Sequence, residues 1–92
     1  MTIRVTRFAA AEALPIRSTF EAPDGTTVRQ LIDLLDAHYG SDLRGELLDG
    51  DVMSHGTLIM LNGESLYQLK TELDTPIKDG DEVFFTVMVC GG

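Results

Sequence analysis

The sequence predicts one α+β domain in which a mixed sheet of about five strands wraps around one main helix. Three observations lead to this prediction. The chain has 92 residues, which is room for a single domain. Residues 27–39 show helical periodicity, and most of the other apolar residues fall in short runs that are typical of strands.

Two strands are expected before the helix. Residues 3–8 alternate β-branched or aromatic with polar side chains from the start of the chain, and residues 16–21 alternate in the same way. The alanine-rich segment 9–14 between them is a loop or a single helical turn, because Pro15 interrupts any longer helix. We therefore expect the two strands to pair as an antiparallel hairpin.

The main helix has clear start and stop signals. Thr27 and Gln30 form the capping-box pattern at its beginning, after a Pro-Asp-Gly turn at residues 23–25. Gly40 is placed to end it in the left-handed conformation. Its apolar face consists of Val28, Leu31, Ile32, Leu35 and Tyr39. This face is expected to pack on the sheet.

The middle of the chain predicts shorter elements. Residues 41–50 form either a short second helix or an ordered loop, which the Asp-Gly-Asp sequence at 49–51 breaks. Residues 57–61 are a compact apolar strand, and the Asn-Gly pair that follows is a strong hairpin signal. We expect the return strand at residues 64–69.

The last strand, residues 83–89, is almost wholly apolar. Val83, Phe85, Val87 and Val89 share one face, and Phe84, Thr86 and Met88 share the other. A strand that is apolar on both faces usually lies inside a sheet. We therefore place it centrally, with the first strand as its natural neighbour.

Composition excludes several classes of function. Fifteen acidic against seven basic residues give a net charge of −8, which disfavours binding to nucleic acid or to an anionic membrane. One cysteine and two histidines at unsuitable spacing predict no disulfide and no metal site. The N-terminal residues lack the apolar stretch of a signal peptide, so the expected location is cytoplasmic.

The sequence ends in Cys-Gly-Gly, and we divide it into a folded domain, residues 1–89, and a flexible tail, residues 90–92. Glycines carry no Cβ, so Gly91 and Gly92 would allow a terminal carboxylate to enter a narrow enzyme channel. Small residues are also common at frayed chain ends, so the pair alone is weak evidence.

Longer motifs strengthen the functional interpretation of the Gly-Gly pair. The chain resembles the ubiquitin-like sulfur carriers of the MoaD/ThiS family, which include the small subunit of molybdopterin synthase and the thiamine-pathway carrier. The matching segments are 27–35, 61–64, 73–83 with its Asp-Gly-Asp-Glu-Val block, and the terminal Gly-Gly. The resemblance implies the β-grasp fold, which agrees with the predicted order of elements. At residues 86–88, where the molybdopterin-synthase subunits typically carry an aromatic residue and a Pro-Pro pair, this chain has Thr-Val-Met.

The resemblance also implies a function. A ubiquitin-activating-type partner would use ATP to adenylate Gly92, and a sulfur donor would convert the adenylate into a thiocarboxylate for cofactor biosynthesis. Molybdopterin-type transfer is favoured, with thiamine or another sulfur-transfer pathway as alternatives. The chain would be a protein substrate rather than an enzyme, with no bound cofactor, and a large synthase subunit is a further candidate partner. The expected partner contacts are Gly91, Cys90, Val89, Met88 and Phe84.

Alternatives remain open at this stage. The two alternatives to a sulfur carrier are a ubiquitin-like modifier that is joined to target lysines through Gly92, and a β-grasp interaction module with an inert tail. Phe84 and Met88 belong either to the core or to an exposed docking patch. Cys90 is better explained as a small residue before Gly-Gly than as a reactive thiol, because no neighbouring cation would lower its pKa.

Overall fold

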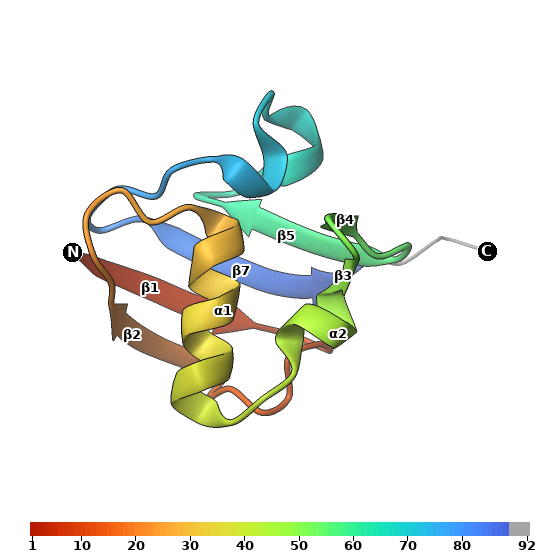
Figure 1. Cartoon of the computed structure of the whole chain (residues 1–92), viewed down its shortest axis with the longest axis horizontal. Coiled ribbons are helices and arrows are strands. Elements are labelled where there is room, and N and C mark those ends of the chain that lie inside the picture. The colour runs from red at the N-terminus through yellow and green to blue at the C-terminus, as the bar shows by residue number, and fades with distance from the viewer. Residues whose placement is uncertain (89–92) are drawn as a thin grey trace.

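The fold is a five-stranded mixed sheet with helices against one face (Figure 1). The computed structural model describes residues 1–88; the predicted tail and Val89 lie outside this range. In spatial order the strands are β2 (Arg17–Glu21), β1 (Thr2–Arg7), β7 (Glu82–Val87), β5 (Thr57–Leu61) and β6 (Glu64–Ser65). This is the predicted β-grasp arrangement.

The last strand lies at the centre of the sheet, as predicted. β7 runs parallel to β1, with Val83 beside Val5, and antiparallel to β5. The predicted hairpin of β1 and β2 is also confirmed, with Ile3 opposite Phe20. Val5, Val83 and Phe85 are fully buried, so the centre of the sheet forms the floor of the core.

The helix α1 (Val28–Tyr39) crosses this floor. The Thr27 hydroxyl accepts a hydrogen bond from the Gln30 amide at 3.2 Å, and the Gln30 side chain accepts one from the Thr27 amide at 3.0 Å. Gly40 has φ 65° and ends the helix as predicted. Val28, Leu31, Ile32 and Leu35 are completely buried. Within residues 1–88, this is the longest helix, and none there is long and apolar enough to cross a membrane.

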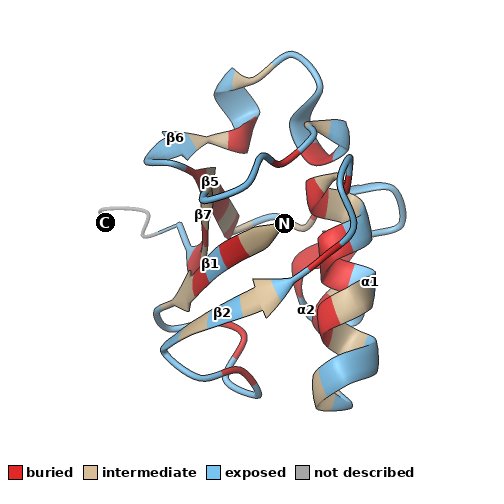
Figure 2. Cartoon of the chain, turned by 90° about the vertical axis from the view of Figure 1, so that its left-hand side faces the viewer, coloured by how far each residue is buried: buried red, intermediate tan, exposed pale blue. Residues whose placement is uncertain are grey.

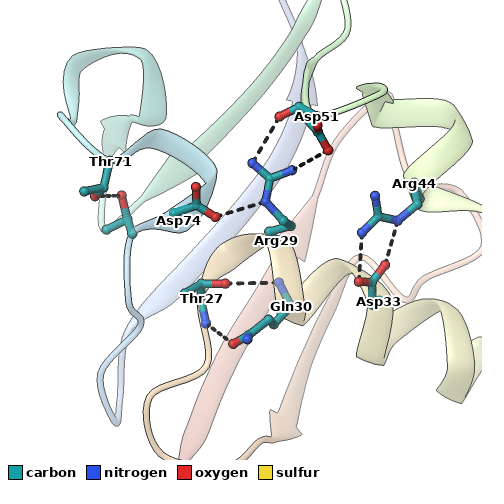
Figure 3. Close-up of polar contacts among 9 residues, drawn as sticks. Thr27, Arg29, Gln30, Asp33, Arg44, Asp51, Thr71 and Asp74 are labelled. Carbon is teal, nitrogen blue, oxygen red and sulfur yellow. Dashed lines mark hydrogen bonds and ion pairs between the residues drawn. The ribbon is translucent and has the colours of Figure 1, made fainter.

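A second helix, α2 (Leu43–Leu47), resolves the alternative left open for residues 41–50. Asp36 of α1 positions its start, because its carboxylate accepts hydrogen bonds from the backbone amides of Leu43 at 2.6 Å and Arg44 at 3.0 Å. Arg44 in turn donates two hydrogen bonds of 2.8 Å to the carboxylate of Asp33 (Figure 3). These contacts tie α2 to α1.

A small hairpin follows α2, formed by β3 (Leu48–Asp49) and β4 (Val52–Met53). The sequence predicted only a break here. Arg29 of α1 donates hydrogen bonds of 3.0 Å to the carbonyl of Asp51 in the hairpin turn and to the carboxylate of Asp74 (Figure 3). One arginine therefore joins three segments that are distant in the sequence.

Two predicted strands are too long. The return strand expected at 64–69 is only β6, and a 3₁₀ turn η1 (Leu66–Gln68) replaces its second half, because Leu66 turns inward and is fully buried. A further 3₁₀ turn, η2 (Glu72–Asp74), was not predicted. β7 ends at Val87 rather than continuing through residue 88, since β5 pairs with it only as far as Thr57 opposite Val87.

Replacing Leu35 by alanine tests the buried face of α1. Leu35 is fully buried, so Leu35→Ala should leave a cavity and lower the free energy of unfolding by roughly 2–5 kcal/mol. Urea unfolding followed by circular dichroism measures the difference. A loss below about 0.5 kcal/mol would show that this face is not core.

The Asp33–Arg44 pair should make stability depend on pH. Hydrogen bonds from Arg44 lower the pKa of the Asp33 carboxyl below its usual 3.8, against a smaller opposing effect of desolvation. A depressed carboxyl pKa stabilises the fold above the unfolded-state pKa, and this contribution disappears as pH falls through the folded-state pKa.

The destabilisation caused by Asp33→Asn should therefore be small, because the pair is about half exposed, and constant near neutral pH. It should shrink below about pH 4. Urea unfolding at a series of pH values measures it, with Glu12→Gln as the exposed control. An Asp33→Asn effect that grows as the pH falls would contradict this assignment.

Candidate functional site

The sheet has one face that the helices do not cover. Figure 2 shows α1 and α2 on the same side of the strands. Val83 and Phe85 face α1 and are fully buried, so the alternating residues Glu82, Phe84 and Thr86 point to the opposite side. We call this side the open face.

Apolar side chains gather on the open face around Phe84. The strand register places Met60 of β5 opposite Phe84 and Leu58 opposite Thr86. Phe84, Met60 and Leu58 are all half-buried, whereas the residues that alternate with them on the other side of β5 and at positions 83 and 85 are buried. Phe84 is thus neither a core residue nor fully exposed, and together the three form a contact surface on the open face.

This surface extends to the point where β7 leaves the sheet. Met88, which alternates to the same side as Phe84, is 43% exposed. The Met88 amide donates a hydrogen bond of 2.6 Å to the carbonyl of Gly56, so the chain is held against the sheet up to this residue. The described chain thus stays attached to the edge of β5 as far as Met88.

The structure describes two of the six predicted site residues. Phe84 lies on β7 and is half-buried, and Met88 follows the strand and is 43% exposed, so neither belongs to the fully buried core. The other four, Val89, Cys90, Gly91 and Gly92, lie outside the described residues. Leu58 and Met60 were missed, because residues 57–61 read Thr-Leu-Ile-Met-Leu and show no polar side that would mark the less buried face.

The chemistry of the surface is that of recognition. Phenyl, thioether and isobutyl groups contribute affinity by removing apolar area from water and offer no acid, base or nucleophile. Within residues 1–88, no three His, Cys, Asp or Glu side chains come together as metal ligands would. The described site is thus suited to holding a partner near the start of the tail.

Comparison with known proteins identifies a family for this chain. The chain matches the ThiS family over residues 6–92. Among curated proteins, no sequence is significantly similar.

Solved structures share the whole fold. One is a putative molybdopterin converting factor subunit 1 from Pyrococcus furiosus, with a TM-score of 0.69 and 25% identity over 96% of this chain and 98% of that one. Another comes from the BexX/CysO complex of Amycolatopsis orientalis. Its TM-score is 0.77, and it shares 19% identity over 98% of this chain and 99% of that one. A third is the small archaeal modifier protein 1 of Methanosarcina acetivorans. Its TM-score is 0.74, and it shares 23% identity over 99% of this chain and 95% of that one.

Two adjacent phenylalanines of β7 separate folding from recognition. Phe85 is fully buried beneath α1, so Phe85→Ala should lower the free energy of unfolding by about 3–5 kcal/mol. Phe84→Ala removes the same atoms from the half-buried open face and should cost clearly less. Parallel urea unfolding of the two variants compares them, and equal losses would mean that Phe84 is part of the core.

Proposed function

Since this chain belongs to the ThiS family, we propose that it is a sulfur carrier whose Gly92 is adenylated by a ubiquitin-activating-type partner and then converted to a thiocarboxylate. The observation that carries the proposal is that the family match includes the Gly-Gly pair at residues 91–92. In the sequence, residues 88–90 separate that pair from the end of the central strand.

The proposed chemistry explains why ATP is required. A carboxylate is a poor electrophile because its charge is shared between two oxygens. In the first step a Gly92 carboxylate oxygen attacks the α-phosphorus of ATP, and pyrophosphate leaves. In the second step hydrosulfide from a sulfide donor attacks the Gly92 carbonyl carbon, AMP leaves with the electron pair of the broken C–O bond, and loss of the S–H proton gives the thiocarboxylate. The partner supplies the ATP site, so this chain acts as a protein substrate and binds no cofactor of its own.

The surface formed by Phe84, Met60, Leu58 and Met88 supports the docking step. Its apolar groups run from the middle of the central strand, at Phe84, to Met88 just past its end. A partner that covers this surface would hold the tail close to its own nucleotide site, which converts an encounter between two molecules into a local reaction. Gly91, without a Cβ, would let the backbone approach that site closely, and Cys90 and Val89 would contact its entrance.

Molybdopterin-type sulfur transfer is the favoured pathway. The Pyrococcus furiosus structure, which shares 25% identity, is described as a putative molybdopterin converting factor subunit. A large synthase subunit would then be a second partner after the activating enzyme, and the sulfur donor a third. Thiamine or another sulfur-transfer pathway uses the same tail chemistry. The proposed location is the cytoplasm, where ATP is available.

A second candidate function is protein modification. The Methanosarcina acetivorans structure is named a small archaeal modifier protein. In that case the activated Gly92 carbonyl would be attacked by a lysine amine of a target protein instead of by a sulfur donor, and an isopeptide bond would form.

Deleting Gly91 and Gly92 tests the role of the tail separately from folding. The truncated protein should melt at the same temperature as the full chain, because the pair follows the last strand and terminal residues bury little area. ATP–pyrophosphate exchange with the activating enzyme should be abolished, because the reacting carboxylate no longer reaches the nucleotide. Exchange at the full-length rate would show that Gly92 is not the activated residue.

The Gly92→Val variant is the matched control. It keeps the length of the chain but adds a β-branched side chain at the reacting residue. Docking through the open face should survive, so this variant should inhibit exchange by the wild-type protein competitively. An inability to compete would show that docking depends on the tail rather than on the open face.

A further inference from the structure

The open face carries a second feature beside the apolar surface around Phe84. A groove of about 810 Å³ lies over β1, β2 and the adjoining part of β7. We call it the arginine groove. Its charged and large apolar lining side chains include Arg4, Arg7, Arg17, Phe8, Ile16 and Phe84.

The charge of the groove differs from that of the rest of the molecule. The protein has a net charge of −8 and only seven basic residues, yet three of its five arginines line this groove. Among residues 1–88, Arg29 and Arg44 form ion pairs with carboxylates, whereas these three do not. Since Glu82 is the one acidic residue in the lining, the groove is a positive region on an acidic protein.

The guanidinium groups keep most of their donors available. Arg7 donates one hydrogen bond of 3.0 Å to the Leu14 carbonyl, and Arg4 donates one of 3.3 Å to the Gly80 carbonyl. A guanidinium has five N–H donors in a planar fork that matches a carboxylate. Arg17 is exposed and pairs across the strands with Thr6, so its side chain stands on the open face beside the groove floor.

The groove also exposes two large apolar side chains. Phe8 is 70% exposed and Ile16 is 63% exposed, and these are the highest exposures of large hydrophobic residues in the described part of the chain. They are not at a frayed loop. The Phe8 amide donates to the Phe85 carbonyl at 3.0 Å, and the Arg7 amide donates to the Ile16 carbonyl at 3.0 Å.

The segment between these residues is anchored in the core. Ala10, Ala11 and Leu14 are buried, and the Ala11 amide donates a hydrogen bond of 2.7 Å to the Glu46 carboxylate of α2. Phe8 and Ile16 are therefore held in place at the rim of the groove. Exposed apolar groups on a rigid support, close to cations without ion pairs, are typical of an interaction site.

We propose that the arginine groove binds an acidic segment of a partner protein that carries a large apolar side chain between its carboxylates. The carboxylates would accept paired hydrogen bonds from the arginine forks, and the apolar side chain would pack against Phe8 and Ile16. A protein segment fits better than a nucleic acid, because the net charge of −8 repels a polyanion of phosphates while a short segment meets only the groove.

The arginine groove would give the proposed carrier a second binding region beside the surface around Phe84. Its test does not depend on sulfur chemistry. The binding measured below requires no activation of Gly92. Loss of binding in the groove and loss of Gly92 activation are thus separate outcomes.

The experiment is an NMR titration of the ¹⁵N-labelled full chain. The probe is a synthetic peptide with a Leu-Phe pair flanked on each side by aspartates, and its control replaces every aspartate by lysine. We expect amide shifts at Arg4, Thr6, Arg17 and Thr19, and affinity that falls as salt is raised. Arg17→Glu should weaken binding by about tenfold or more, whereas Lys70→Glu, the same charge change at an exposed site away from the groove, should leave it unchanged.

A second variant, Phe8→Ser, tests the apolar part of the proposal without changing any charge. It should also weaken binding, and an unchanged spectrum elsewhere shows that the fold is intact. Equal binding of the lysine peptide, or shifts confined to residues outside the groove, would overturn the proposal. So would tighter binding of a single-stranded oligonucleotide, or self-association of the free chain in sedimentation that Arg17→Glu abolishes, because the occupant would then be a nucleic acid or a second copy.

Discussion

The parallel pairing of β1 and β7 at the centre of the sheet determines the rest of the structure. Parallel neighbours cannot be joined by a tight turn, so the chain between them has to cross over, and it does so through α1. One helix covers one face of the sheet. The pairing therefore buries Val83 and Phe85 beneath α1 and, by the alternation of a strand, leaves Phe84 on the open face. In the sequence, residues 89–92 come shortly after this central strand, which ends at Val87.

The sequence predicted those elements whose signals are local. The capping box of Thr27 and Gln30 and the left-handed Gly40 define α1, and its buried residues follow from helical periodicity. The elements that were missed depend on distant contacts. Leu66 leaves the predicted strand because the core takes it inward, and the β3–β4 turn is held by Arg29, which lies 22 residues earlier. No periodicity within a short segment reports such contacts.

The same distinction applies to the candidate site. The Gly-Gly pair and the apolar character of Phe84 and Met88 are visible in the sequence. That Met60 and Leu58 complete the surface follows only from the register of β5 on β7. The arginine groove could be predicted even less from the sequence, because Arg4, Arg17 and Phe84 come from three different strands. That Arg4 and Arg17 form no ion pair among residues 1–88 is likewise a property of the fold. Composition gave the net charge of −8 but not this local reversal.

The central claim is that Gly92 becomes a thiocarboxylate. The most direct measurement is the intact mass of the protein after incubation with ATP, the activating enzyme and a sulfide donor. Replacement of one carboxyl oxygen by sulfur predicts a gain of about 16 Da, which fragmentation should assign to Gly92. An unchanged mass, a gain on another residue, or heavier covalent conjugates in place of this product would contradict the account.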